Sequence, residues 1–210
     1  MKMNLSYIQI FLLGYLVLYL VLFLISLIIP KRAGKDSKGV AGGYPSGKRI
    51  FASLSSLLFI GIIILYVINE DSANWFLKIP LIFNEFFQIM GMAIIGFGFV
   101  LETVGILTLG VNFRMMLPKE RTNLVTHGIY AHIRHPIGLS VILFVIGLFF
   151  IVPNLLSLVN LVCNVLVYNS KANFEEHYLL KVHKEKYENY KQRVGKFFPK
   201  LTRQTSTTSP

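Results

Sequence analysis

The sequence has very little cysteine: Cys163 is the only one among 210 residues. A single cysteine cannot form an internal disulfide, which excludes a disulfide-stabilised scaffold. Because Cys163 lies within an apolar run, we interpret it as a small packed side chain. Charge is scarce as well, since 15% of the residues are charged and 54% are hydrophobic. This composition excludes an ordinary soluble domain.

Two long runs, residues 5–29 and 50–68, contain no charged side chain. At about 1.5 Å per residue, each is long enough as a helix to cross a hydrocarbon core of about 30 Å. The first run is also longer than the about 7–15 apolar residues of a signal peptide, and Pro30 and basic residues follow it. We therefore expect an all-α integral membrane protein whose first helix is retained.

Acidic residues are outnumbered, with 10 Asp and Glu against 21 Lys and Arg, which gives a net charge of +11. Nineteen of the 21 basic residues fall in three stretches, 31–49, 113–136 and 169–210. Basic residues concentrate in the cytoplasmic segments of membrane proteins, where they also face anionic lipids. The excess charge therefore requires no nucleic-acid partner. We expect the N-terminus outside, and both basic connections and the C-terminus in the cytoplasm.

The remaining apolar segments complete about five transmembrane helices. A third run spans 82–111, and two shorter runs, 137–151 and 155–168, are separated by the helix-breaking pair Pro153-Asn154. As helices of about 15 residues the last two rise only about 22 Å, so we expect a tight hairpin. From residue 169 onward, charged and aromatic residues recur at near-helical spacing, which predicts a cytoplasmic amphipathic helix. Residues 201–210 are almost entirely polar and are expected to be disordered.

Two carboxylates interrupt the third apolar run. Glu85 lies near its outer end, where the carboxylate can stay hydrated, whereas Glu102 lies deeper, about ten residues from the inner end. An ionisable group inside a membrane segment is a candidate functional residue. The alternative for Glu102 is that it pairs with a neighbouring polar group or reaches interfacial water, and the sequence leaves both open.

All five histidines lie after residue 126, on the cytoplasmic side of the expected topology. Clustered histidines suggest a metal centre, as in membrane di-iron enzymes. Those sites require more histidines in several closely spaced clusters than this chain provides. Zinc is poorly served too, because the single cysteine lies in the hairpin. We therefore predict no metal site.

The tripeptide Arg134-His135-Pro136 precedes the hairpin. Proline suits the first turn of a helix, whose free N–H groups and positive dipole end attract anions. Arg134 would add a cation able to bind a carboxylate through two parallel hydrogen bonds. Glu175-Glu176 follows the hairpin and returns an opposite charge to the same interface. In isolation, Arg134 could be one more membrane anchor and the glutamates a solvated helix face.

Three motifs in this order resemble a known family. They are Leu124-Val-Thr-His-Gly-Ile-Tyr130 with Arg134-His135-Pro136, then Phe174-Glu175-Glu176 after an apolar hairpin, and then Tyr187-x-x-Tyr190 with a closing Pro199. The pattern is similar to the isoprenylcysteine carboxyl methyltransferase family and its phospholipid methyltransferase relatives. The resemblance covers about residues 109–199. The three transmembrane helices expected in 1–111 match it only as hydrophobic segments, and residues 112–200 are the expected catalytic half.

The resemblance also implies S-adenosyl-L-methionine (SAM) as cofactor, bound between the Arg-His-Pro loop and the glutamate pair. The implied cofactor-binding residues are Asn123, Leu124, Val125, Tyr130, His135, Pro136, Ile137, Gly138 and Glu175. Lys171 occupies the position of the family's substrate-binding arginine, and Lys171 or Arg134 would orient an acceptor carboxylate. The chain departs from the family pattern at Gly138, where a tyrosine is expected, and at Ser140, where a glycine is expected.

The sequence therefore predicts a SAM-dependent methyltransferase acting on a lipophilic acceptor that enters from the bilayer. The resemblance makes a prenylated cysteine carboxylate the first acceptor to consider, and such a carboxylate is already ionised and needs no general base. A phospholipid or other lipid N- or O-methyltransferase is the nearest alternative, and an amine acceptor would require a base such as a histidine. An NADPH-dependent, sterol-reductase-like protein and a non-catalytic membrane interaction protein are more distant alternatives.

Overall fold

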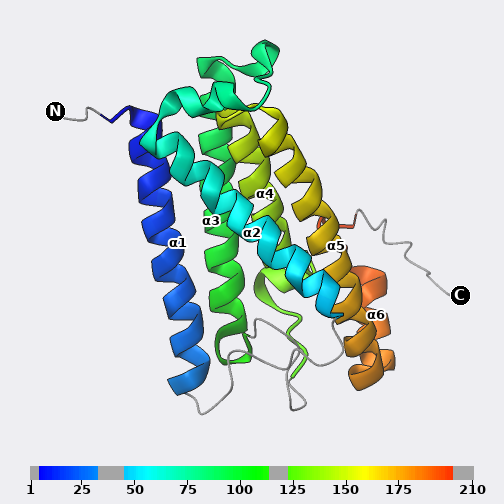
Figure 1. Ribbon diagram of the computed structural model, residues 1–210. Helices are drawn as coiled ribbons and strands as arrows, with labels where there is room; N and C mark the ends of the chain where they lie inside the picture. Colours follow the sequence, from blue (N-terminus) through cyan, green and yellow to red (C-terminus); the bar gives the residue numbers. More distant parts are fainter. Residues whose placement is uncertain (1–4, 33–44, 114–122, 201–210) are drawn as a thin grey trace, which may run out of the picture.

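The computed structural model describes residues 5–32, 45–113 and 123–200, which fold into six α-helices and short 3-10 turns (Figure 1). No β-sheet forms within these ranges. Two isolated bridges are present there, Lys78 with Asn154 and Ile133 with Gly195. The α-helices are α1 (Tyr7–Arg32), α2 (Ser46–Ile68), α3 (Glu85–Leu109), α4 (Pro136–Ile151), α5 (Leu155–His183) and α6 (Glu185–Arg193). The expected all-α class is confirmed.

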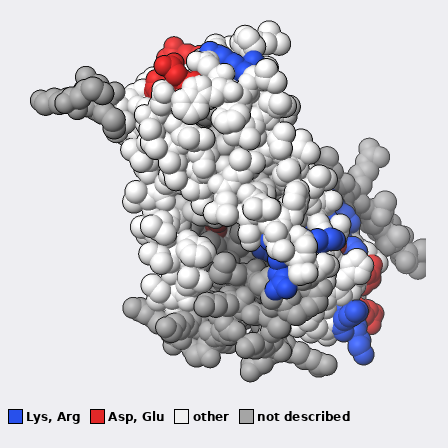
Figure 2. All heavy atoms as spheres, in the orientation of Figure 1, with Lys and Arg blue, Asp and Glu red and all other residues white. Residues whose placement is uncertain are grey.

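Four of these helices, α1, α2, α3 and α5, are long and apolar enough to cross a membrane, whereas α4 is shorter at 16 residues. Large apolar side chains project outward from them, for example Val17 at 60%, Leu57 at 64% and Phe97 at 62% exposure. Such a surface is stable only against lipid or another apolar partner. Figure 2 shows an uncharged belt between charged ends, as expected for a bundle embedded in a bilayer.

The closest helix pair is α3 with α4, which meet through glycine. A Cβ atom added at Gly91 would lie 2.6 Å from the Gly147 carbonyl oxygen, and one added at Gly147 would lie 2.6 Å from the Gly91 oxygen. Small residues let membrane helices approach to backbone contact, where dispersion contacts replace the missing hydrophobic drive. Ile95 and Phe144 extend this contact into the main core, where they pack with Leu12 of α1.

The predicted break at Pro153-Asn154 is confirmed, since α4 ends at Ile151 and α5 begins at Leu155. Asn154 caps α5: its side-chain oxygen accepts a hydrogen bond from the Ser157 amide at 2.9 Å, and the Ser157 hydroxyl accepts one from the Asn154 amide at 3.2 Å. This reciprocal capping box satisfies two amides that the first helical turn would otherwise leave unpaired.

The prediction for the second arm of the hairpin is wrong. The helix does not end near residue 168 but continues as α5 to His183, over 29 residues, so no separate amphipathic helix begins at Asn169. The shift from apolar to polar side chains changes the surroundings of the helix, not its backbone preference. No proline or glycine interrupts residues 155–183. The break comes at Lys184, which has a φ of 46° in the left-handed region, and α6 follows as a short separate helix.

Polar side chains also join helices inside the bundle. The Asn160 side-chain amide on α5 donates to the Ser55 carbonyl on α2 at 2.9 Å, and both residues are buried. Gln9 on α1 donates to the Val67 carbonyl on α2 at 3.0 Å. These bonds fix α2 across the bundle, where it forms one wall of the cavity described below. The predicted disordered tail 201–210 and most of the basic loop 31–49 lie outside the described residues.

Candidate functional site

The loop before α4 takes its shape from a glycine. Gly128, in the 3-10 turn η4 (Gly128–Ala131), has a φ of 57°, and a Cβ there would lie 3.0 Å from the Thr108 side chain at the end of α3. A left-handed φ and close packing together require glycine at this position. The turn that follows places Tyr130 in a buried position at the cytoplasmic end predicted for the bundle.

Arg134 is held by a carboxylate, and that carboxylate belongs to Glu176. The Nη2 atom lies 2.8 Å and the Nε atom 3.2 Å from Glu176 Oε1, and His135 Nε2 lies 3.2 Å from the same oxygen. The resemblance implied a cofactor contact for Glu175, whereas the carboxylate that pairs with Arg134 is the neighbouring Glu176. Adjacent helical residues point about 100° apart, so the side chain that turns inward is Glu176 while Glu175 stays half exposed.

The segment after α6 forms hydrogen bonds with the Arg-His-Pro loop. The Arg134 amide donates to the Gly195 carbonyl at 2.9 Å and the His135 amide donates to the Lys196 carbonyl at 3.0 Å. The Arg134 guanidinium donates to the Val194 carbonyl and, at 3.2 Å, to the Lys191 carbonyl. The Nε, Nη1 and Nη2 groups of Arg134 therefore all donate to acceptors within the protein.

Lys196 ties this C-terminal segment to α5. Its ammonium donates to the side-chain oxygens of Asn169 at 2.6 Å and Asn173 at 2.7 Å, one helical turn apart. Partial burial lowers the pKa of Lys196 below its usual value. The Arg-His-Pro loop, the C-terminal half of α5 and the segment after α6 are therefore connected by hydrogen bonds into one unit.

Two buried tyrosines of α6, Tyr187 and Tyr190, lie at the end of the bundle that is predicted to face the cytoplasm. The Tyr190 hydroxyl donates to the Tyr130 carbonyl at 2.6 Å, and burial raises the pKa of Tyr190 to about 12. Tyr187 is 1% exposed, and its hydroxyl has no hydrogen-bond partner in the described part of the chain. Both line the cavity below. Neither was assigned to the site beforehand, although the Tyr187-x-x-Tyr190 spacing belongs to the motif pattern and could have pointed to them.

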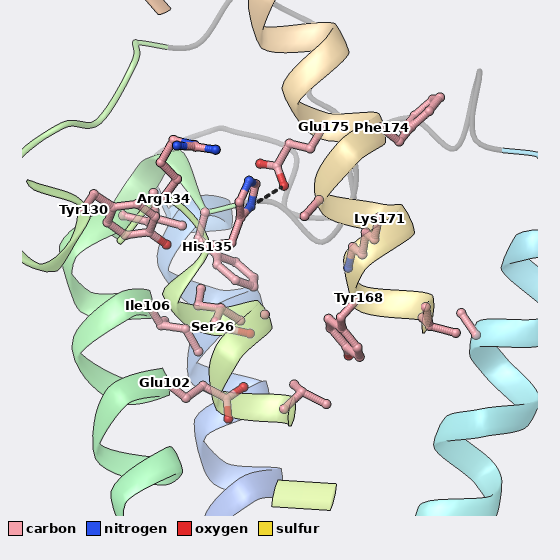
Figure 3. A pocket seen from close by; sticks show the side chains of 18 of the residues that line it. Ser26, Glu102, Ile106, Tyr130, Arg134, His135, Tyr168, Lys171, Phe174 and Glu175 are labelled. Atoms are coloured by element: carbon pink, nitrogen blue, oxygen red, sulfur yellow. Dashed lines mark ion pairs between the residues drawn. The ribbon is translucent and has the colours of Figure 1, made fainter. Parts of the chain in front are cut away.

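A cavity of about 820 Å³ joins these elements (Figure 3). Ten of the eleven predicted site residues line it: Asn123, Leu124, Val125, Tyr130, Arg134, His135, Ile137, Gly138, Lys171 and Glu175. The exception is Pro136, which is fully buried at the first position of α4 and starts that helix. The structure thus brings together residues from two segments about 40 positions apart, while their individual roles remain predictions.

The cavity continues well into the membrane-spanning part, where the N-terminal helices supply its walls. The residues that these helices contribute include Tyr19, Ser26, Ser53, Ser56 and Glu102. Sequence reasoning singled out Glu102 as a candidate functional residue but missed the walls from α1 and α2, because these helices carry no motif. Figure 3 shows Glu175, Lys171 and Tyr168 descending along one face of α5, with Glu102 opposite the lower end of this row.

The absent tyrosine at Gly138 is compensated in space. A Cβ at this position would lie 3.2 Å from the Phe197 ring and 3.8 Å from the Tyr168 ring. Phe197 also lies 6.1 Å from the His135 ring, measured between ring centroids. Aromatic side chains from the C-terminal segment and from α5 therefore fill the volume around the position where the family pattern has its own tyrosine.

The chemistry of this lining suits an organic ligand with both polar and apolar parts. Glu175, with 49% of its side chain exposed, offers carboxylate oxygens, and His135 Nδ1 lies 3.6 Å from one of them. Tyrosine rings offer faces that attract cations. Within the described ranges, no group of three or more His, Cys, Asp or Glu side chains is placed to hold a metal ion.

Comparisons with known proteins support the resemblance. The sequence model of the phospholipid methyltransferase family matches residues 86–186, from the start of α3 into α6. A Protein-S-isoprenylcysteine O-methyltransferase from Tribolium castaneum is 32% identical over 114 residues, which are 52% of this chain and 41% of that protein. Residues 86–186, just under half of the chain, are therefore similar to the isoprenylcysteine carboxyl methyltransferase and phospholipid methyltransferase family. These matches confirm the resemblance predicted from the motifs.

The similarity extends to the fold. A solved structure of the eukaryotic intramembrane Ras methyltransferase ICMT (isoprenylcysteine carboxyl methyltransferase) superimposes with a TM-score of 0.62 at 23% identity. The superposition covers 93% of this chain and 69% of that one, so it includes α1 and α2. The chain spans about two fifths of the length of the Tribolium castaneum relative.

Proposed function

We propose that the protein is a SAM-dependent membrane methyltransferase acting on a lipophilic acceptor, with the carboxylate of an isoprenylcysteine-like group as the favoured acceptor. The observation that carries this proposal is the cavity itself. One end is lined by Glu175, Tyr130 and the Arg-His-Pro loop, and the other runs between apolar helices that face lipid. Such a cavity can hold a polar cofactor and a lipid chain at once.

The residues present fit SAM. Its ammonium and ribose hydroxyls are hydrogen-bond donors, and the half-exposed Glu175 carboxylate is an acceptor in the cavity wall. Asn123 adds amide groups and the Tyr187 hydroxyl has no partner among described residues, so both can bond a polar ligand. Tyr130, Leu124, Val125, Ile137 and Gly138 supply apolar surface for an aromatic base. When bound, SAM supplies a methyl group activated by the positive sulfonium.

Lys171 is our candidate for holding the acceptor. It lies four residues before Glu175 on α5, so both project from the same face into the cavity (Figure 3). Its ammonium can bind one carboxylate oxygen of the acceptor and leave the other free to attack. Because that carboxylate is already ionised, the protein needs only to place it in line with the methyl group and exclude water.

We assign Arg134 a positioning role and not a substrate contact. Its guanidinium is directed toward Glu176 and the carbonyls of Lys191 and Val194, which fixes the loop that carries His135. Helix α4 begins directly after this loop at Pro136. The ion pair between Arg134 and Glu176 therefore also sets where the start of α4 lies relative to α5. Arg134 thereby preorganises the cavity through its neighbours.

A phospholipid amine acceptor is the second candidate, favoured by the family model that matches residues 86–186. An ammonium must lose a proton before it can attack the methyl group. His135 lines the cavity and contacts both Glu175 and Glu176, so it is the group available as a base.

We place the cavity mouth and the C-terminus in the cytoplasm, where basic residues of the chain concentrate.

The product of methyl transfer distinguishes the two acceptors. The purified protein in nanodiscs is incubated with methyl-labelled SAM and either a farnesylated cysteine analogue or phosphatidylethanolamine. Label released by mild base as methanol identifies a carboxyl ester and supports the favoured acceptor. Label retained in a base-stable lipid amine supports the second. Absence of label in both acceptors, with Lys171→Ala as background control, would contradict the proposal.

A further inference from the structure

A carboxyl group lies at the deep end of the cavity. Glu102 is seven residues before the end of α3 at Leu109, about 10 Å along the helix axis. It is 6% exposed and lines the cavity. Figure 3 shows its side chain directed into the space between α3 and α5, well below the level of Glu175 and His135. The methyl-transfer role proposed above makes no use of it.

Among the described residues, Glu102 has no hydrogen-bond partner for its Oε2 atom that would give it a structural role. The hydroxyl of Ser26, which also lines the cavity, donates within its own helix to the Phe23 carbonyl at 2.6 Å. Buried polar groups are otherwise almost always paired in folded proteins. Oε2 itself is enclosed by protein, but the Glu102 side chain lines the cavity, so a turn of the carboxyl group about its last side-chain bond would let it pair with a cavity occupant.

The nature of the occupant follows from this pairing. A plain isoprenyl chain is a hydrocarbon and would cover Glu102 without bonding it, which is unfavourable for a buried carboxyl. An occupant with a hydroxyl or amine at that depth would donate a hydrogen bond to it. A site built to bond such a group discriminates strongly against an analogue that lacks it. Tyr19, Ser26 and Tyr168 contribute further polar groups to the cavity wall, and Figure 3 shows Ser26 and Tyr168 between the levels of Lys171 and Glu102.

We propose that Glu102 is a specificity-determining residue that recognises a hydrogen-bond donor carried within the lipid part of the acceptor. The preferred acceptor then carries such a donor on its isoprenoid chain, and an acceptor with a plain prenyl chain is used less efficiently. This inference rests on the proposed function, since it concerns the acceptor of that same cavity. It adds a second recognition point, so the reacting group lies near Lys171 and Glu175 while the donor of the lipid body lies near Glu102.

The test compares matched acceptors on wild type, Glu102→Leu and Glu102→Gln in nanodiscs. Three prenylcysteine analogues share one chain, which is unmodified, carries a mid-chain hydroxyl or carries a mid-chain amine. We expect wild type to favour a functionalised analogue at least tenfold in kcat/KM, mainly through KM, and Glu102→Leu to lose that preference. Glu102→Gln keeps an acceptor oxygen, so it should retain a hydroxyl preference and lose an amine preference. Glu85→Gln, at the exposed start of α3, is the matched control.

A binding measurement separates this inference from the proposed function. The non-reactive alcohol and amine, which lack the cysteine carboxylate, are titrated against each variant and followed by thermal stability. Stronger stabilisation of wild type than of Glu102→Leu supports the inference even if no analogue is methylated, in which case the proposed function alone fails. Equal behaviour of wild type and Glu102→Leu toward all three chains, in turnover and in binding, would overturn the inference. If Glu102→Leu does not fold, Glu102→Gln decides through the amine.

Discussion

Arg134 Nη2 lies 2.8 Å from Glu176 Oε1 in an ion pair whose two side chains are each only 7% exposed. Removing one partner of a buried pair leaves an uncompensated charge and typically costs about 3–5 kcal/mol. Glu176→Gln should therefore lower the stability of the protein in detergent by roughly that amount, measured as a fall in Tm. An exposed carboxylate on α6, Glu188, provides the control, and Glu188→Gln should change stability by less than about 0.5 kcal/mol.

The same pair can be tested by replacing both partners. Buried ion pairs can often be exchanged for apolar side chains of similar volume with little loss of stability. The double variant Arg134→Met with Glu176→Leu should recover most of the Tm that Glu176→Gln loses. Because Arg134 also holds the Lys191 and Val194 carbonyls, recovery should be incomplete. A double variant as unstable as the two single variants combined would contradict the account of an unpaired buried charge.

The hydrogen bond from Tyr190 to the Tyr130 carbonyl predicts a defined pH dependence. Burial raises the pKa of Tyr190 to about 12, compared with about 10 for an unperturbed tyrosine. The stabilisation is then complete below about pH 10 and is lost as pH rises through about 12. The Tm difference between wild type and Tyr190→Phe, corresponding to about 1 kcal/mol, should stay constant from about pH 7 to 9.5 and shrink above it. A difference that already falls between about pH 7 and 9 would contradict this assignment.

Gly128 should not tolerate a side chain. Its φ of 57° opposes one, and so does the Thr108 side chain, which would lie 3.0 Å from an added Cβ atom. Gly128→Ala should cost about 1–2 kcal/mol and weaken SAM binding, because it displaces the turn that carries Tyr130. Gly96 has nothing within 4 Å of such a Cβ, and Gly96→Ala in α3 should be neutral or slightly stabilising. Both variants are compared by Tm and by equilibrium dialysis with labelled SAM.

The tyrosine of the family pattern cannot simply be restored. A side chain at Gly138 meets the Phe197 ring, whose Cε1 atom lies 3.2 Å from the Cβ position. Gly138→Tyr should displace Phe197, loosen the C-terminal segment and lower SAM affinity about tenfold, equivalent to about 1.4 kcal/mol. Adding Phe197→Ala provides space for the new ring and should restore part of the affinity. Equal affinity in both variants would show that Phe197 does not compete for this volume.

Features set by local chemistry could be predicted from the sequence. The apolar runs gave the membrane helices, and Pro153-Asn154 gave the end of α4 and the start of α5. The polarity change at Asn169 predicted a new helix wrongly, because polarity reports surroundings while helix continuity depends on the backbone. Only a break such as that at Lys184 ends a helix.

The candidate site could be predicted in part for a similar reason. Motif residues of the loop and of α5 converge on the cavity, which ten of the eleven predicted site residues line. Which of the adjacent Glu175 and Glu176 turns inward depends on the rotation of α5, which no spacing in the sequence determines. Likewise, walls contributed by α1 and α2, and the unpaired oxygen of Glu102, follow from tertiary packing alone.

The most direct test of the central claim is SAM binding to the purified protein and to two matched variants. Glu175 lines the cavity, whereas Glu185 is an exposed residue at the start of α6. A charge-assisted hydrogen bond contributes about 1.5–3 kcal/mol, which corresponds to a loss of about 10- to 150-fold in affinity. We predict saturable binding of SAM by wild type and by Glu185→Ala with equal affinity, and at least about tenfold weaker binding by Glu175→Ala. Absence of SAM binding by wild type, or equal affinity in all three proteins, would contradict the account.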